Sequence, residues 1–383
     1  MSTRIVRFFD TSKKRYRTFI ENEAGDLRTL SRRYGPSSQP LWAKRSEMPD
    51  QSYVSFIENR EFECKPPDGI HLVSEVEEQD SWGSLYLQGR MLHSKGFRGQ
   101  GIRIGIADTG LDTSHSCFRA MRLQKFVDID RTTGETFEVA PFDSQWHGTF
   151  CTSLLCGSET NGFMRGLAID SEIFVAKVFN KFNSSTAAVH SAFEFFIQNE
   201  VRVASISLGA PNFEPSWIDI INEFVDGGGV VIAGIGNDFG GDAPTISPGN
   251  YPIKGLLGVG AHDEDGIVWD DSGGGEVVLS EFSEFGLPDS VMKPDLLAPG
   301  AGMVAVGSKG KFKVGSGTSY ATPLIAGLVS CLWSKNPEFD GSSILSLLFG
   351  LLSDAGSPGP DVRYGRGKID PEKLSVILSD ILS

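Results

Sequence analysis

Three residues of reactive types stand at points where the chain can hold a side chain rigidly. Asp108 directly follows the apolar run at residues 102–107, so its carboxylate stands at the carboxyl end of a strand and suits the orientation of a partner. His147 opens a stretch with helical patterning and has only Gly148 beside it, which makes it a candidate general base. Ser319 lies where a glycine-rich segment leads into an apolar helix, and the positive end of that helix favours developing oxyanion charge.

A fourth position adds a polar donor to this set. The apolar run at residues 230–233 ends in a glycine-rich turn that exposes the side-chain amide of Asn237. Such a donor at the end of a strand can stabilise a tetrahedral oxyanion together with the backbone N–H of Ser319. The sequence therefore predicts that these two residues act together.

The elements that must position these residues alternate between strands and helices. Runs typical of strands buried on both faces recur at residues 102–107, 173–178, 203–207, 230–233 and 256–259. Segments with helical patterning lie between them, at residues 147–155, 186–198 and 215–225. The alternation predicts an α/β fold with a doubly wound, mostly parallel sheet and helices on both faces. In such a sheet, functional groups gather at the carboxyl ends of strands.

Length and charge divide the chain into two unequal units. Of the 383 residues, 35 are Lys or Arg and 49 are Asp or Glu, for a formal net charge of −14. Residues 1–50 hold 11 basic and 6 acidic side chains, net +5, which leaves 24 against 43, net −19, for residues 51–383. We expect a small α+β unit over residues 1–80, a linker over 81–98 that leads into the larger domain, and a catalytic domain over 99–383. The acidic balance argues against nucleic acid as a partner.

Four short motifs in a fixed order carry a resemblance to a known family. They are Asp108-Thr-Gly, His147-Gly-Thr, the Gly-Asn turn at Asn237 and Gly317-Thr-Ser-Tyr-Ala-Thr-Pro323. In this order they resemble the subtilisin-like serine proteases, the subtilases, in which Asp, His and Ser follow one another along the chain. The similarity extends from about Leu92 to Trp333, and the His and Asn motifs look closest to site-1 protease-like members.

The resemblance implies a serine endopeptidase that needs no cofactor. Ser319 would be the nucleophile, His147 the general base, and Asp108 the residue that orients the imidazole. Asn237 and the Ser319 N–H would hold the oxyanion.

The resemblance also implies how a peptide substrate binds. Ser207, Leu208 and Gly209 would present their backbone to an extended peptide, which adds as an extra strand. Residues 180–183 stand where many members of the family have a glycine-rich edge strand. Asp238 and nearby Asp242 would place negative charge at the rim of the pocket for the residue before the cut, which predicts a preference for basic or polar residues there.

The N-terminal unit is expected to be an inhibitory or folding-assisting pro-segment. The family habit suggests this role, and the opposite charges of the two units would favour docking of the first on the second. An acidic, glycine-rich loop at residues 263–271 leaves a structural calcium ion open, although a solvated loop is the simpler interpretation. We expect no metal-binding residue.

The chain carries no pattern typical of export or of membrane insertion. Its first ten residues lack an apolar core and a small-residue cleavage site, and its longest apolar runs reach about half of what a membrane-spanning helix needs. The cysteines are scattered without C-x-x-C spacing, at Cys64, Cys117, Cys151, Cys156 and Cys331. Such a pattern argues against a disulfide framework. We therefore expect a cytoplasmic protein that makes no contact with membranes and acts on intracellular protein or peptide substrates.

Several alternatives stay open at this point. Asp112 is a second acid near the first strand end, although capping of the turn suits it better. Cys151 follows His147 by four residues, so the two could bind a metal, yet no third ligand is spaced nearby. Tyr320, next after the candidate nucleophile, could shape the primed side of the cleft. The alternative functions are a maturation protease for a ribosomally made peptide and a peptide-binding pseudoenzyme.

Overall fold

The main body of the protein is built on a ten-stranded sheet. The computed structural model describes residues 4–10, 15–21, 26–29, 43–44, 54–63, 74–180 and 183–380. The strands of the sheet are, in spatial order, β10 (Thr136–Glu138), β9 (Arg122–Ile129), β11 (Glu172–Lys177), β8 (Arg103–Asp108), β13 (Val203–Ile206), β15 (Val230–Gly234), β17 (Leu256–His262), β20 (Leu296–Pro299), β24 (Lys368–Ile369) and β23 (Leu352–Ser353). All neighbours from β9 to β24 run parallel, and only the two outermost pairs are antiparallel.

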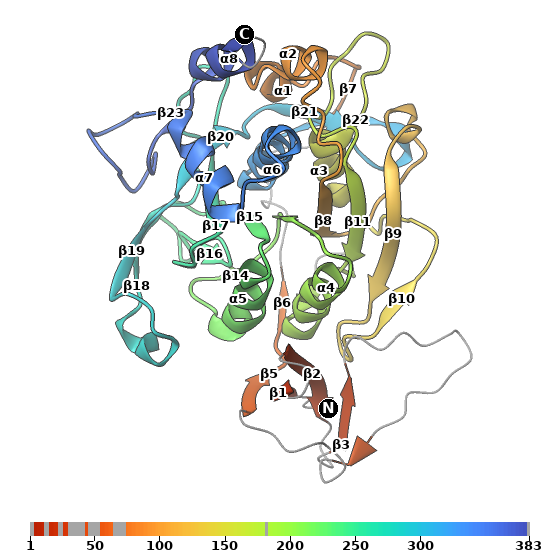
Figure 1. Ribbon diagram of the computed structural model, residues 1–383, viewed down its shortest axis with the longest axis vertical. Helices are drawn as coiled ribbons and strands as arrows, with labels where there is room; N and C mark the ends of the chain where they lie inside the picture. Colours follow the sequence, from red (N-terminus) through yellow and green to blue (C-terminus); the bar gives the residue numbers. More distant parts are fainter. Residues whose placement is uncertain are drawn as a thin grey trace.

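Helices cover both faces of this sheet (Figure 1). One core contains α3 (His147–Cys156), α6 (Thr318–Lys335), α7 (Gly341–Gly350) and α8 (Pro371–Asp380), and the other contains α4 (Thr186–Gln198) and α5 (Ile218–Asp226). Within β8, Ile104 and Ile106 join the first core and Ala107 joins the second, as the alternation of strand side chains requires. The predicted doubly wound α/β fold is confirmed, and its five strand runs and three helical segments are present with small shifts at their ends.

The winding of the sheet changes direction beside β8. The chain leaves β8, forms β9 and β11 on one side of it, and then crosses to β13 on the other side. A crevice forms at such a switch point, outside the carboxyl ends of the two strands on either side of it. Asp108 ends β8 and Ser207 directly follows β13, so both stand at this crevice.

Smaller elements complete the body. They are β14 (Ala210–Pro211), β16 (Ile246–Ser247), β18 (Gly275–Val278), β19 (Ser290–Lys293), β21 (Met303–Val306), β22 (Phe312–Gly315) and the 3-10 helices Ser116–Phe118, Pro215–Trp217, Ser280–Phe285 and Ser308–Gly310.

The segment before the main body packs into it. Strand β7 (Ser74–Val76) pairs antiparallel with β22, and the expected linker over 81–98 forms α1 (Trp82–Tyr86) and α2 (Gly89–Ser94). Leu87 and Leu92 of this stretch are fully buried in the core that contains α3 and α6. Residues 81–98 therefore connect the two units, as expected, and also form part of the hydrophobic core of the main body.

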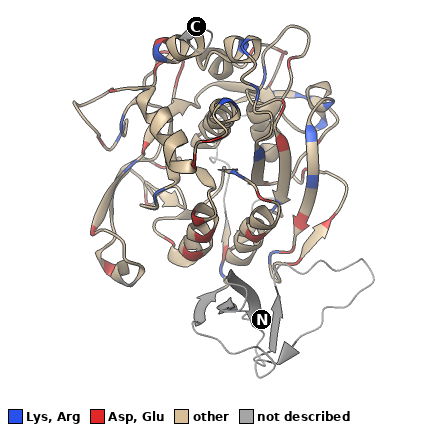
Figure 2. Cartoon of the chain, in the orientation of Figure 1, with Lys and Arg blue, Asp and Glu red and all other residues tan. Residues whose placement is uncertain are grey.

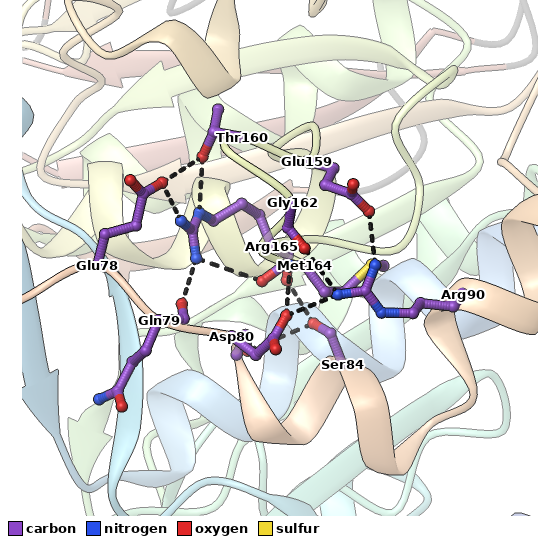
Figure 3. A network of polar contacts seen from close by, with 11 residues as sticks. Glu78, Gln79, Asp80, Ser84, Arg90, Glu159, Thr160, Gly162, Met164 and Arg165 are labelled. Atoms are coloured by element: carbon purple, nitrogen blue, oxygen red, sulfur yellow. Dashed lines mark hydrogen bonds and ion pairs between the residues drawn. The ribbon is translucent and has the colours of Figure 1, made fainter.

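A buried arginine attaches the preceding residues to the loop after α3 (Figure 3). Arg165 is 1% exposed, and its guanidinium donates to the Glu78 carboxylate, the Gln79 carbonyl and, at 3.2 Å, the Thr160 hydroxyl. Its guanidinium carbon also lies 4.6 Å from the centroid of the Phe312 ring. This one cation thus ties residues 78–79, the loop and β22 together.

The N-terminal unit forms a separate sheet. Its strands are β4 (Ala43–Lys44), β3 (Asp26–Thr29), β2 (Arg15–Glu21), β1 (Arg4–Asp10) and β5 (Val54–Glu58), in that spatial order and antiparallel throughout. The helical part of the expected α+β unit has no counterpart among the described residues of 1–80; residues 1–3, 11–14, 22–25, 30–42, 45–53 and 64–73 lie outside the description. Strand β6 (Glu61–Glu63) then pairs with β12 (Asn183–Ser185) of the main body. Of residues 180–183, which replace the glycine-rich edge strand of many family members, residues 181–182 are not described.

Candidate active site

Asp108 and His147 meet at the crevice beside β8. Nδ1 of His147 lies 2.8 Å from Oδ1 of Asp108, which also accepts the backbone N–H of Thr109 at 2.7 Å. An ionised carboxylate can only accept, so the ring must donate from Nδ1 and keep Nε2 as its acceptor. The strand fixes the carboxylate and the first turn of α3 fixes the ring. The pair is therefore arranged for proton transfer at Nε2.

The electrostatics of His147 favour such a transfer. The His147 side chain is 13% exposed and that of Asp108 is 1% exposed. Burial favours the neutral ring, but the charge and the hydrogen bond of Asp108 act against it and prevail, which puts the pKa of His147 well above its ordinary value. The neighbouring carboxylate thus makes His147 a stronger base than an isolated imidazole.

Ser319 lies beside this pair without touching the ring. It is the second residue of α6, and its hydroxyl donates to the Ser207 carbonyl at 3.4 Å. Among the described residues, no hydrogen bond joins this hydroxyl to His147. The thiol of Cys151 provides the nearest link, since it donates to the Ser319 carbonyl at 3.3 Å. Catalytic hydrogen bonds are often long or misaligned in enzymes without substrate and tighten on binding.

The amide of Asn237 is oriented by the residue before Ser319. Its Oδ1 accepts the Thr318 N–H at 2.8 Å and the Thr318 hydroxyl at 3.0 Å. These bonds leave Nδ2 as a donor without a partner among the described residues. A Cβ placed on Gly317 would lie 3.6 Å from this nitrogen, so the donor faces the glycine-rich segment before α6. The structure thus brings together Asn237 and the start of α6, as the sequence predicts.

The segment after β13 runs along the same crevice. The Ser207 hydroxyl donates to the Ser319 carbonyl at 2.8 Å, and Leu208 is 1% exposed, so its side chain belongs to the core. A Cβ on Gly209 would lie 2.4 Å from the Ser247 carbonyl, which only glycine avoids. What this segment can offer to a ligand is therefore mainly its backbone.

Two further residues border the space between these segments. The exposed carboxylate of Asp238, next in sequence to Asn237, accepts the Ala243 N–H at 3.0 Å and thus closes its own loop. Ile246 lies between Gly209 and Gly236, because a Cβ built on these glycines would meet its side chain at 2.6 and 3.2 Å. Ile246 belongs to no motif in the sequence, and only the fold reveals its place.

Cys151 and Tyr320 lie behind the imidazole. The Cys151 sulfur is 3.9 Å from both ring nitrogens of His147. The possible ligand atoms of Asp108, His147 and Cys151 lie within 4.8 Å of one another. The fold therefore provides Asp108 as the third possible metal ligand, which the sequence spacing did not reveal. A metal ion there would have to displace the His147–Asp108 hydrogen bond. Tyr320 is 1% exposed with its ring 4.5 Å from that of Phe150, so the expectation that its phenol shapes the cleft is wrong.

Two other acids near β8 have hydrogen-bonding roles. Asp112 accepts the Ser114 N–H at 2.9 Å and the Lys309 N–H at 2.6 Å, in keeping with the capping role expected for it. Asp143, which the sequence analysis did not single out, accepts hydrogen bonds from Thr109 and Thr149 on the two sides of the Asp108–His147 pair. The signal that could have found Asp143 is an acidic residue just before a helix start.

The chain is similar to known proteases over most of its length. The subtilase family model matches residues 99–367. Human membrane-bound transcription factor site-1 protease is 30% identical over 302 residues, which cover 76% of this chain and 27% of that protein. Subtilisin DY of Bacillus licheniformis is 26% identical over 294 residues, with coverage of 76% and 97%. Subtilisin E of Bacillus subtilis is 25% identical over 307 residues, with coverage of 78% and 72%.

The matched region contains all the elements described above from β8 to β23. The chain spans about a quarter of the length of the site-1 protease that it matches, at 27%, and nearly all of subtilisin DY, at 97%. The family predicted from the four motifs is confirmed. The chain belongs to the subtilase family.

Proposed function

We propose that this chain is a serine endopeptidase that works through Ser319 as nucleophile, His147 as general base and Asp108 as orienting carboxylate. The observation that carries the proposal is the 2.8 Å contact of Asp108 with His147 at the carboxyl end of β8, beside the first turn of α6. The Nδ2 of Asn237 and the N–H of Ser319 are the proposed oxyanion donors. Each step is a proton transfer, an addition to the carbonyl carbon or the departure of a leaving group that takes its proton from His147, so the scheme includes no cofactor.

In this scheme, Ser319 Oγ attacks the scissile carbonyl carbon while His147 Nε2 takes its proton. Asp108 stabilises the imidazolium that forms and holds its orientation. The ring then gives the proton to the leaving amine as the acyl-enzyme forms, and water repeats the sequence to release the acid. The turn of the Ser319 hydroxyl from the Ser207 carbonyl toward Nε2 is part of the first step.

A fluorophosphonate probe tests the proposed nucleophile. We expect the wild type to be labelled at Ser319, and the Ser319→Ala and His147→Ala variants to stay unlabelled. Ser316→Ala is the matched control, because this serine lies in the same segment and its hydroxyl only accepts the Gly302 N–H, at 2.9 Å. A wild type that is freed of its N-terminal unit and still unlabelled would favour a peptide-binding pseudoenzyme.

The proposed substrate is an extended peptide that binds to the backbone of Ser207, Leu208 and Gly209. The negative charge of Asp238 at the rim favours a basic or polar residue before the cut, and Ile246 limits the depth available to it. A cleavage profile on a peptide library measures this preference. A profile dominated by glutamate at that position would overturn it.

The N-terminal unit is the proposed intramolecular inhibitor and pro-segment. Strand β6 pairs with β12, just before α4, and the Phe62 ring packs 5.3 Å from that of Trp217. Asn59 Oδ1 accepts the Ala187 N–H at the start of α4, at 3.0 Å. Figure 2 marks acidic residues on α5, namely Asp219, Glu223 and Asp226, which suit a unit whose first 50 residues carry a net charge of +5.

Self-processing is visible on a gel. We expect a purified wild-type chain to lose its N-terminal unit on incubation and a Ser319→Ala chain to stay intact. Two full-length bands would remove the self-processing role and leave the protease proposal standing.

We propose a reducing, intracellular compartment in which the enzyme processes specific protein or peptide substrates. The four described cysteines, Cys117, Cys151, Cys156 and Cys331, are buried thiols without disulfides, and Cys64 lies outside the described residues. Within the part of the chain that is described, none of the helices has the length and apolar character to cross a membrane. Fractionation of cells that express the tagged protein tests the compartment, and recovery with membranes or in the medium would contradict it.

A further inference from the structure

The carboxylate of Asp143 joins the two elements that hold the Asp108–His147 pair. Its Oδ1 accepts the Thr109 hydroxyl at 2.8 Å and the Gln145 N–H at 2.9 Å. Its Oδ2 accepts the Thr149 N–H at 2.9 Å and the Thr149 hydroxyl at 2.6 Å. Thr109 directly follows Asp108, and Thr149 lies in the first turn of α3. One side chain therefore reaches both halves of the pair.

The two threonine hydroxyls extend these links to the opposite element. The Thr109 hydroxyl accepts the Gly148 N–H at 2.9 Å, next to the imidazole. The Thr149 hydroxyl accepts the Asp112 N–H at 2.9 Å, in the loop after β8. Two direct hydrogen bonds thus run between the end of β8 and the start of α3, and Asp143 joins the two threonines that accept them.

Both oxygens of Asp143 act as acceptors in this arrangement. Each threonine hydroxyl donates to Asp143 and accepts one backbone N–H. An asparagine amide in its place would present an N–H₂ group to two donors and leave them without an acceptor. The residue at the usual capping position of α3, Trp146, provides no side-chain cap, so Asp143 also supplies the negative charge that a helix start favours.

We propose that Asp143 is a positioning residue that fixes the distance and the angle between Asp108 and His147. The inference rests on the proposed catalytic function of that pair and adds a residue to it. Asp143 touches neither the substrate backbone nor the reacting atoms. It acts through Thr109 and Thr149, which makes the basicity of His147 the property that it controls.

The titration of His147, followed by NMR in the Ser319→Ala background, tests the proposal without relying on activity. We expect the midpoint to fall by about half a pH unit or more in Asp143→Asn and in Thr109→Val, because a longer contact with Asp108 stabilises the imidazolium less. With Ser319 restored, the rate of fluorophosphonate labelling should fall about 10- to 100-fold. Thr109→Val keeps the test open if Asp143→Asn does not fold.

The matched control is Asp130→Asn. Asp130 Oδ1 also accepts three local hydrogen bonds, from the N–H groups of Thr132 and Thr133 at 2.9 and 2.7 Å and from the Thr133 hydroxyl at 2.9 Å. It lies in a turn between β9 and β10, so the control should lose stability without moving the His147 midpoint. Unchanged midpoints in folded Asp143→Asn and Thr109→Val would overturn the positioning role. A wild type that is freed of its N-terminal unit and still resists labelling would refute the proposed function instead, and the titration would still decide the role of Asp143.

Discussion

The side-chain oxygen of Asn237 accepts hydrogen bonds from Thr318, and its Nδ2 is the proposed oxyanion donor. A substitution can therefore remove the donor and keep the acceptor. Asn237→Asp keeps an acceptor for the Thr318 N–H and removes the Nδ2 donor, so the start of α6 should stay in place. We expect the rate of fluorophosphonate labelling to fall by about 10²- to 10³-fold, the usual loss for one oxyanion donor, with little change in the urea midpoint. Labelling as fast as that of the wild type would contradict the assigned donor.

His262 makes the stability of the fold sensitive to acid. Its ring lies between Trp82 and Tyr86, at centroid distances of 6.0 and 5.1 Å, and Nδ1 lies 2.6 Å from the Asp263 carbonyl. Burial lowers the pKa of His262 to about 4, so the folded protein keeps the ring neutral where the unfolded chain protonates it.

Stability should therefore fall as the pH drops from about 6.5 to 4, by about 3 kcal/mol from this residue alone. Urea unfolding at several pH values, in the Ser319→Ala background, measures the loss. In His262→Gln this part of the pH dependence should disappear. If the free energy of unfolding changes equally with pH in the proteins with and without His262→Gln, His262 does not contribute.

At the scale of single residues, the sequence predicts the reactive side chains better than the residues that hold them in position. Asp108, His147, Ser319 and Asn237 follow from residue type and from their place at element ends. Asp143 does not, because its partners are 34 and 6 residues away and only folding brings them together. The expectation for Tyr320 was wrong because successive residues of a helix point about 100° apart, so a residue next to Ser319 can face the core.

At the scale of elements, Arg165 joins two loops and a strand by its contacts with residues 78–79, Thr160 and Phe312. Arg165→Met should reduce the free energy of unfolding by about 3 kcal/mol or more, because removal of one partner leaves the Glu78 carboxylate without its cation. Urea unfolding in the Ser319→Ala background measures it. Arg98→Met is the control, since both side chains of the Arg98–Asp170 pair are 40% exposed and such a pair contributes about 1 kcal/mol or less. Equal losses in the two variants would contradict this account.

The elements themselves were predictable where burial dictates their composition. Central strands such as β15 are buried on both faces, so every position is apolar and the run is visible in the sequence. Strands β6 and β12 are short and polar, and they pair across more than 100 residues. Their pairing depends on two edges meeting in space, which composition does not encode.

At the scale of the whole molecule, the contact of residues 59–62 with the main body should govern access to the site. Replacement of both Asn59 and Phe62 by alanine removes the cap on Ala187 and the ring contact with Trp217. We expect the full-length variant to cleave casein faster than the wild type, because β6 leaves β12 more often. Arg60→Ala should change little, since the Arg60 side chain is 62% exposed in its pair with Glu214. Equal rates for the double variant and the wild type would exclude this contact as the one that keeps the N-terminal unit in its inhibiting position.

The basic character of residues 1–50, net +5 against −19 for the rest of the chain, was visible in the composition, and the position of the contact with the main body was not. Net charge measures long-range attraction and carries no information on geometry. The described contact depends on particular groups, such as the Asn59 side chain at the start of α4.

The guanidinium of Arg165 has one further consequence for the molecule. A bound ion can leave its site, but an arginine cation is joined to the chain by covalent bonds and stays charged at every ordinary pH. The attachment of residues 78–79 therefore does not depend on the concentration of any dissolved cation, and a chelator has nothing to remove there. The start of the main body stays fastened equally well in surroundings poor or rich in metal ions.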